Sequence, residues 1–193
     1  MTKVAIQGIR GSYSSVAALK AFGEELELIE CASFEGVFQA MSSGLATHAV
    51  LPVRNSTVGK IGATNRLIAN HKPKALGEVE VRVDHVLATM PGTKFEDLNS
   101  VRSHSEAFRQ CAIFLNSNPH LRTIIGFDTA SCIRSVVHDE ITGQAAICSR
   151  EAAEIYGGVI LRDQIADSRD NKTTFSILSS VPKPRSYRRV TQR

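Results

Sequence analysis

Short apolar runs alternate with amphipathic segments along most of this chain, and this alternation limits the folds that it can adopt. Residues 26–32 and 49–53 are short segments that are typical of strands, and the segment between them places Val37, Phe38 and Met41 at helical spacing. Repeated units of strand and helix predict an α/β fold with parallel layers and binding sites at the carboxyl ends of strands. Further strands are expected at residues 4–6, 101–102, 123–125, 145–148, 159–161 and 174–179, and further helices at residues 14–22, 108–115, 129–137 and 150–156.

One segment, residues 75–90, is too long for a short strand of this kind. Val79, Val81, Val83 and Leu87 alternate with polar residues along it, which is typical of a continuous strand. We expect this strand to bridge two lobes, and the last strand to return to the first lobe, so that a cleft lies between them. The predicted division is a first lobe of residues 1–78 and 165–181, a second lobe of residues 79–164 and a basic tail of residues 182–193.

The composition fits a globular protein of one domain or two small lobes. The chain has 193 residues, of which 42% are hydrophobic, so it can bury a core. The formal net charge is +4, but five basic residues lie within residues 182–193, where there is no acidic residue. A solvated chain end is a more common interpretation of such a segment than a nucleic-acid or membrane contact. Neither nucleic acid nor a membrane is therefore expected as a partner.

The cysteines and the absence of long apolar runs indicate the compartment. Cys31, Cys111, Cys132 and Cys148 are far apart, lie in apolar stretches and form no CxxC or His/Cys pair, which predicts buried free thiols and no metal site. No stretch approaches the ~20 apolar residues that a membrane helix needs, and no long apolar leader follows Met1. We expect a soluble, cytoplasmic protein.

Polar clusters stand at the ends of several predicted strands, where they would converge on a small-molecule cleft. The cluster with Gly8, Gly11 and Ser12 is weak as a phosphate loop, because it lacks the GxGxxG pattern and the lysine of a P-loop. A tight turn and a helix amino terminus that holds a carboxylate are equally good interpretations of it. The clusters are residues 8–14, 52–56, 103–110 and 171–175.

The order and the amino-acid sequences of these clusters resemble those of the catalytic domain of the prephenate dehydratase family, from residue 4 to residue 179. Residues 8–14 (GIRGSYS) are similar to the family motif GPxGTFS, and residues 52–56 (PVRNS) are similar to PIENS. Residues 103–107 (SHSEA) with Gln110 resemble SHPQAL and its following glutamine. Other matches are His85, residues 128–130, 145–149 and 152–157, and the closing motif NxTRF, which is met by Asn171, Thr173 and Phe175.

This resemblance implies a two-lobed, periplasmic-binding-protein-like (type II) α/β fold with the substrate in the cleft. It also implies a homodimer, no metal and no organic cofactor. The family reaction removes the ring carboxylate and ring hydroxyl of the prephenate dianion, giving phenylpyruvate, carbon dioxide and water. The resemblance assigns catalytic positions to Thr173, Asn55, Ser103 and Gln110, and substrate-binding positions to Gly11, Ser12, Arg54, Ser56, Asn171, Thr174 and Phe175. Since the chain ends soon after the last motif, we expect a stand-alone enzyme without the ACT domain that many family members append.

Each of these residues also has a simpler structural interpretation. Thr173 fits an ordinary β-branched strand residue, Asn55 and Ser56 fit turn or helix-cap residues, and Gln110 fits a solvent-facing helical residue. His85 and His104 are expected to be structural.

Two departures from the family pattern fall inside its motifs. The glutamate of PIENS is Arg54 here, and the arginine of TRF is Thr174. One hypothesis is that Arg54 reaches into the cleft and supplies the missing guanidinium for a substrate carboxylate. The alternative is that Arg54 turns to solvent. A third departure places Ile9 and Arg10 in the glycine motif, where Arg10 either binds substrate or is exposed.

The function predicted from the sequence is that of a prephenate dehydratase-type lyase of aromatic amino-acid biosynthesis. It would act on prephenate or on its amino counterpart arogenate, and the sequence does not decide between them. One alternative is a relative that decarboxylates prephenate and keeps the ring hydroxyl. Another is a non-catalytic module that binds an anionic aromatic precursor.

Overall fold

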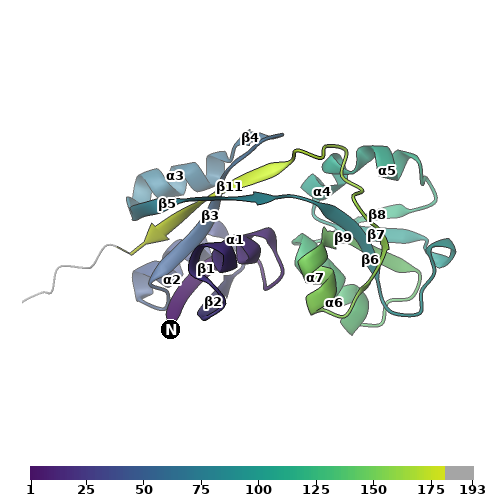
Figure 1. The fold of residues 1–193 in the computed structure, drawn as a ribbon, viewed down its shortest axis with the longest axis horizontal. Coiled ribbons are helices and arrows are strands. Elements are labelled where there is room, and N and C mark those ends of the chain that lie inside the picture. The colour runs from purple at the N-terminus through teal and green to yellow at the C-terminus, as the bar shows by residue number, and fades with distance from the viewer. Residues whose placement is uncertain (181–193) are drawn as a thin grey trace, which may run out of the picture.

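The computed structural model of this protein describes residues 1–180, and the predicted basic tail, residues 182–193, lies outside the described residues. Two α/β lobes lie side by side (Figure 1), which confirms the predicted two-lobed α/β fold. The first lobe contains β1 (Thr2–Gln7), α1 (Tyr13–Phe22), β2 (Leu26–Cys31), α2 (Phe34–Ser43), β3 (His48–Asn55), β4 (Gly59–Lys60), α3 (Gly62–His71), β5 (Lys74–Arg82) and β11 (Lys172–Ser179). The second contains β6 (His85–Thr89), a 3₁₀ turn (Phe95–Asp97), β7 (Ser100–Ser103), α4 (Ser105–Gln110), α5 (Ala112–Asn116), β8 (Arg122–Ile125), α6 (Thr129–His138), β9 (Gln144–Ser149), α7 (Arg150–Ile155) and β10 (Val159–Arg162).

The two sheets repeat one strand order. The first sheet runs β2-β1-β3-β11-β5, with β4 paired to β3. The second sheet, taken in the same sense, runs β8-β7-β9-β6-β10. In each sheet three neighbouring strands are parallel, while the strand that follows them, β11 or β6, is antiparallel to its neighbour. The carboxyl ends of the parallel strands in both lobes are the positions where an α/β fold places its ligands.

Each sheet is covered by helices on both faces, because its strands are apolar on both sides. In the first lobe, α1 packs on one face around Phe175 and Val50, and α2 and α3 pack on the other around Leu51 and Leu178. In the second lobe, α6 and α7 cover one face, while α4 and α5 cover the other. Figure 1 shows α6 and α7 on the opposite side of the second sheet from α4 and α5.

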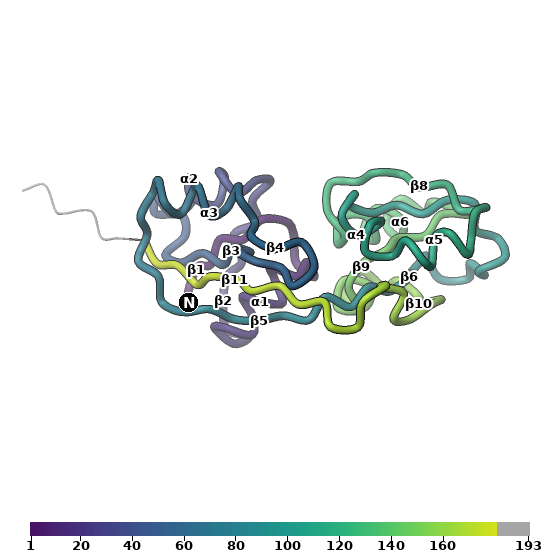
Figure 2. The backbone as a smooth tube through the Cα atoms, turned by 90° about the horizontal axis from the view of Figure 1, so that it is seen from above, coloured from purple at the N-terminus to yellow at the C-terminus, as the bar shows by residue number. Residues whose placement is uncertain are grey.

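The chain crosses between the lobes twice, in two segments that run close together in Figure 2. The predicted long strand is divided at Val83 and Asp84 into β5, which belongs to the first sheet, and β6, which belongs to the second. The first sheet therefore extends to Arg82 rather than ending at the predicted boundary, residue 78. The returning segment stays on the second lobe beyond residue 164, because Ile165 packs into its core and the Asp167 amide donates to the Gln110 carbonyl.

Two expected helices differ from the structure, and two further elements were not predicted. The helix α1 begins at Tyr13 rather than at the expected residue 14, and its N-cap is Ser12, whose hydroxyl accepts from the Ser15 amide at 3.3 Å. The helix predicted across residues 108–115 is divided at Cys111 into α4 and α5. No strand or helix was predicted for the middle segment that contains β4 and α3.

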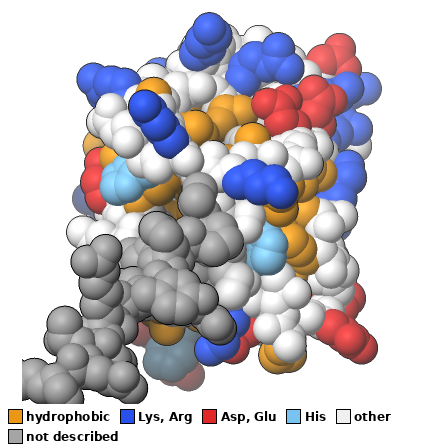
Figure 3. All heavy atoms as spheres, turned by 90° about the vertical axis from the view of Figure 1, so that its left-hand side faces the viewer, with side chains coloured by type: hydrophobic (Ala, Val, Ile, Leu, Met, Phe, Trp, Pro, Cys, Tyr) orange, Lys and Arg blue, Asp and Glu red, His pale blue; other side chains and the backbone are white. Residues whose placement is uncertain are grey.

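The end of the first lobe that faces away from the second lobe has a mixed surface. Figure 3 shows lysine and arginine side chains there among acidic and apolar ones. Within residues 1–180, the helices are too short or too polar to cross a membrane.

Candidate active site

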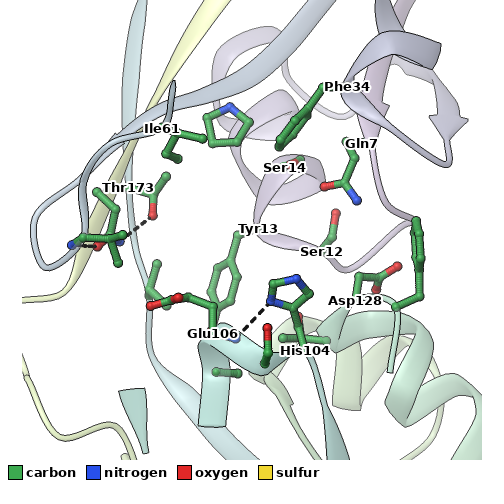
Figure 4. Close-up of a pocket in the computed structure, with 18 of the residues that line it drawn as sticks. Gln7, Ser12, Tyr13, Ser14, Phe34, Ile61, His104, Glu106, Asp128 and Thr173 are labelled. Carbon is green, nitrogen blue, oxygen red and sulfur yellow. Dashed lines mark hydrogen bonds between the residues drawn. The ribbon is translucent and has the colours of Figure 1, made fainter. Parts of the chain in front are cut away.

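A cavity of about 820 Å³ lies between the two lobes. Figure 4 shows its lining side chains converging from the first lobe and from the second. Five of the residues predicted from the sequence line it, namely Ser12, Asn55, Gln110, Thr173 and Phe175. The other predicted residues, Gly11, Arg54, Ser56, Ser103, Asn171 and Thr174, are not among the lining residues.

Thr173 and Asn55 face each other across β11 and β3, where they are register partners. The Asn55 side-chain amide donates from Nδ2 to Thr173 Oγ1 at 2.9 Å and to Asn171 Oδ1 at 2.8 Å. The Asn55 side-chain oxygen, Oδ1, accepts from the backbone amides of Thr57 and Val58 at 2.9 and 3.0 Å. The orientation of the Asn55 carboxamide is thus fixed by four hydrogen bonds.

This orientation determines what the Thr173 hydroxyl can do. Because Thr173 Oγ1 accepts the hydrogen bond from Asn55, its own proton is directed elsewhere. The side chain lines the cavity, and its hydroxyl donates to no other group among the described residues. The hydroxyl is therefore placed as a hydrogen-bond donor toward a ligand in the cavity.

Asn171 and Ser56 support this arrangement from outside the cavity. Asn171 is buried and holds Asn55 through its side-chain oxygen. The Ser56 hydroxyl accepts from the Lys172 amide at 2.9 Å and donates to the Asp170 carbonyl at 3.2 Å. Both residues fasten the end of β3 to the start of β11, so their observed contacts are structural.

Ser103 and Gly11 also make structural contacts. The Ser103 hydroxyl is fully buried and donates to the Ile147 carbonyl at 2.7 Å, which joins β7 to β9. Gly11 packs against the second lobe, where its carbonyl accepts from the Ser149 hydroxyl at 2.7 Å. A Cβ added to Gly11 would lie 2.8 Å from the Ala152 Cα, so this close approach requires glycine.

The hypothesis that Arg54 reaches into the cavity is not supported by its position. Arg54 is exposed, whereas Asn55, the next residue of β3, lines the cavity, because successive side chains of a strand point to opposite faces. The Arg54 guanidinium instead donates from Nη2 to Thr174 Oγ1 at 3.5 Å. The two departures from the family motifs are thus neighbours on the face of the sheet that is turned away from the cavity.

A chain of polar side chains links the lobes beside the cavity. The Tyr13 hydroxyl lies 2.9 Å from the Asp84 carbonyl and 3.1 Å from His85 Nδ1, and His85 Nε2 lies 2.9 Å from Gln110 Oε1. Burial lowers the pKa of His85 below its ordinary value, so its imidazole is neutral at pH 7. Since the Gln110 oxygen faces Nε2, the single ring proton lies on Nε2, and the Gln110 amino group stays free to donate.

Tyr13 was not predicted from the sequence as a member of this row of polar side chains. The sequence feature that could have indicated its role is the tyrosine at the phenylalanine position of the family motif GPxGTFS. His85, which the sequence favoured as structural, orients a residue that lines the cavity.

The amino termini of helices from both lobes point toward the cavity. Their N-cap residues line it: Ser12 for α1, Ser33 for α2, His104 for α4 and Asp128 for α6. The free amides and the dipole of a helix amino terminus favour negatively charged ligand groups. Among the described residues that line the cavity there is no lysine or arginine, so these termini and the polar side chains are its means of holding an anion.

The remainder of the lining is largely apolar and could enclose a ring. Phe34, Ile61 and Phe175 contribute from the first lobe, and Ile125 and Phe127 from the second. Within residues 1–180, His, Cys, Asp and Glu side chains form no group of three or more that could hold a metal ion.

Comparison with known proteins gives a family match over most of the chain. A family model described as "Prephenate dehydratase" matches residues 4–183. Arogenate dehydratase/prephenate dehydratase 1 of Arabidopsis thaliana, a chloroplastic protein, is 40% identical over 180 residues, which cover 93% of this chain and 45% of that relative. The chain therefore spans about half the length of this relative.

Solved structures give the same fold. A prephenate dehydratase from Arthrobacter aurescens, in complex with L-Phe, aligns with a TM-score of 0.85 at 25% identity over 94% of this chain and 61% of that chain. A protein described as "GqqA- a novel type of quorum quenching acylases" aligns with a TM-score of 0.81 at 29% identity over 94% and 65% of the two chains. A periplasmic substrate-binding protein from Coxiella burnetii aligns with a TM-score of 0.50 at 15% identity over 93% and 84%, a likeness in fold alone. The predicted periplasmic-binding-protein-like fold is confirmed.

Proposed function

This chain belongs to the prephenate dehydratase family, and we propose that it catalyses the family reaction on prephenate or arogenate. In this reaction the bond between the ring and its carboxylate breaks, and the electron pair enters the ring as the ring becomes aromatic. The hydroxyl on the opposite ring carbon leaves and is protonated to water. Aromatisation supplies most of the driving force, so the protein must mainly orient the substrate and assist the leaving hydroxyl.

The observation that carries this proposal is the hydrogen bond from Asn55 Nδ2 to Thr173 Oγ1. It leaves the Thr173 proton free for the departing hydroxyl, whose negative charge grows in the transition state. A threonine hydroxyl is a weak acid, so Thr173 acts as a fixed donor rather than as a group that ionises first. A donor that is oriented before the reaction stabilises the developing charge without reorganisation cost.

The other lining residues fit the remaining parts of such a substrate. Helix amino termini with Ser12 and Ser33 at their caps favour the carboxylate of the substrate side chain, and the Gln110 amino group adds a donor that His85 holds in place. Phe34, Ile61 and Phe175 offer apolar contact to the ring. Loss of the ring carboxylate as neutral carbon dioxide is favoured in surroundings that do not stabilise its charge.

A product assay tests the proposal. Purified protein is incubated with prephenate and, separately, with arogenate, and the products are identified. We expect phenylpyruvate from prephenate or phenylalanine from arogenate. A non-aromatic hydroxylated product would indicate decarboxylation alone, and binding of either compound without turnover would indicate a binding module. Either result would reject the proposed dehydratase function.

The Thr173→Val variant isolates the hydroxyl, because valine keeps the shape of threonine and its preference for strands. We expect kcat to fall by about 100-fold or more, with a small change in KM. Thr173→Ser, which keeps a hydroxyl, should retain a larger share of the activity. Equal rates for the valine variant and the native protein would remove Thr173 from the mechanism.

The homodimer and the cytoplasmic location expected from the sequence stay predictions. The Arabidopsis relative is described as chloroplastic, and that description applies to the relative. Sedimentation of the purified protein tests the first prediction, and fractionation of the source cells tests the second.

A further inference from the structure

We propose that Asp128 is a specificity-determining residue that selects arogenate, which bears an ammonium group, over prephenate, which bears a keto group at the same position. This inference rests on the proposed function. It concerns the end of the cavity that is remote from Thr173, where Figure 4 shows Asp128 and Ser12 on the side of the pocket opposite Thr173.

The charges that line the cavity favour an ammonium group. Three carboxylates, those of Glu35, Glu106 and Asp128, are among the described lining residues, and no lysine or arginine accompanies them. Prephenate carries two negative charges and no positive one, whereas arogenate carries the same two carboxylates and one ammonium. A carboxylate close to the substrate therefore repels the first compound and attracts part of the second.

Asp128 is the carboxylate of the three that best suits this role. Glu106 is already paired with the Arg109 guanidinium, and Glu35 is exposed. Asp128 uses Oδ1 to accept from the Ser131 amide at 2.7 Å, as the N-cap of α6. Its other oxygen, Oδ2, is shielded from solvent and has no hydrogen-bond partner within residues 1–180.

An unpaired, buried carboxylate oxygen lowers stability unless a donor reaches it. An ammonium group from a ligand is such a donor, and it would also neutralise the charge. Prephenate offers only a carbonyl oxygen at this position, and two acceptors facing each other leave both unpaired. A site built to bind an N–H group strongly rejects the analogue that lacks this group.

Asp128 and Ser12 both lie beside Gly8, although they come from different lobes. A Cβ built on Gly8 would lie 3.3 Å from Ser12 Oγ and 3.9 Å from Asp128 Oδ2. Ser12 caps α1, whose amino terminus favours a carboxylate. A carboxylate at α1 beside an ammonium at Asp128 matches the amino-acid head group of arogenate.

The shape of the substrate fits this placement. In arogenate the ring hydroxyl and the amino-acid side chain occupy opposite ring carbons. With the hydroxyl at Thr173, the side chain extends toward Ser12 and Asp128, across the pocket.

The experiment compares kcat/KM for arogenate and for prephenate in the native protein and in Asp128→Asn. Asparagine is as good an N-cap as aspartate, so α6 keeps its cap while the charge is lost. Glu151→Gln is the control, because Glu151 is exposed, belongs to the first turn of α7 and does not line the cavity. We expect the native protein to prefer arogenate, and Asp128→Asn to lower that preference by about 10- to 100-fold. The Glu151→Gln variant should keep the native ratio.

A native preference for prephenate, or an unchanged ratio in Asp128→Asn, would overturn the proposal. If neither compound is turned over, the proposed dehydratase function is rejected, and binding measurements then test the role of Asp128. Calorimetry would compare L-phenylalanine with phenylpyruvate, which differ in the same amino and keto groups. Loss of L-phenylalanine affinity alone in Asp128→Asn would support the role of Asp128, and equal losses for both compounds would reject it.

Discussion

Arg54 and Thr174 are register partners on neighbouring antiparallel strands, and the guanidinium donates to the threonine hydroxyl on the face of the sheet that is turned away from the cavity. These are the two positions at which the chain departs from the family motifs PIENS and TRF. The two departures therefore lie in one cross-strand pair, with arginine and threonine where the family motifs have glutamate and arginine. Arg54 is exposed and its hydrogen bond to the buried Thr174 is 3.5 Å long, so this contact contributes little to stability.

We expect Arg54→Ala to change kcat/KM by less than about twofold and the free energy of unfolding by less than about 1 kcal/mol. The physical reason is that the guanidinium is exposed and contacts Thr174 rather than a lining residue. Steady-state kinetics and urea unfolding measure the two quantities. A tenfold rise in KM would restore the hypothesis that Arg54 binds a substrate carboxylate.

Replacing Asn55 should affect both stability and catalysis, in contrast to Thr173→Val. Asn55→Ala removes four hydrogen bonds and leaves the amides of Thr57 and Val58 without their acceptor. We expect a loss of about 2–3 kcal/mol in the free energy of unfolding, together with a large fall in kcat. Urea unfolding and kinetics on the same preparations test this. A stable variant that is merely inactive would show that the turn does not depend on Asn55.

The burial of His85 predicts that stability falls in acid. Its folded-state pKa is lowered by desolvation, so the unfolded state binds a proton at a higher pH than the folded state. The stabilisation is complete above about pH 6.5, the unfolded-state pKa, and is lost as the pH falls below it, at up to about 1.4 kcal/mol per pH unit.

Replacing the imidazole with a group that does not titrate tests this pH dependence. The variant His85→Gln should flatten the slope of unfolding free energy between pH 7 and pH 5. His138→Gln is the control, because His138 is exposed. Equal slopes in the two variants would exclude His85 as the source.

The contact between Gly11 and Ala152 should tolerate no side chain. Gly11 has a φ of +85°, and a Cβ would lie 2.8 Å from the Ala152 Cα, so Gly11→Ala combines backbone strain with a clash between the lobes. We expect a loss of about 3 kcal/mol or more. Gly44→Ala is the matched control, since Gly44 has a φ of +81° and open space around it, and it should cost about 1 kcal/mol. Similar losses in the two variants would show that the lobes adjust to the extra atom.

The cysteines should differ in reactivity toward a thiol reagent at pH 8. Burial raises the pKa of Cys111 to about 12 and that of Cys132 to about 12, and it raises the pKa of Cys148 as well. These thiols stay protonated and covered, whereas Cys31 is half-buried. We expect at most one reactive thiol per folded chain and four after unfolding in urea. Labelling that survives the change Cys31→Ser would contradict this expectation.

The sequence predicted the fold well where pattern and local chemistry agree. The helix α2 forms where Val37, Phe38 and Met41 predicted it, and its ends carry strong local signals, a serine N-cap at Ser33 and a left-handed glycine at Gly44. The crossing strand was recognised by its alternation, but its division at Val83 and Asp84 was not. Alternation shows that side chains face two environments, and it does not show to which sheet each residue belongs.

The candidate site was predicted in part. Thr173 and Asn55 were predicted together because both lie in family motifs at strand ends. Ser103 and Gly11 also lie in family motifs, but their observed contacts are structural and they do not line the cavity. The Tyr13 hydroxyl and the unpaired oxygen of Asp128 depend on distances between lobes, which neither composition nor spacing contains.

The position of β11 has a consequence for the order in which the protein is assembled during synthesis. This last strand lies between β3 and β5 in the first sheet, so that sheet cannot close until the ribosome has made almost all of the described chain. The second lobe is continuous in sequence and can fold while β11 is still being made. Thr173 arrives with that strand, and a nascent chain therefore gains its proposed catalytic hydroxyl only as its first lobe is completed.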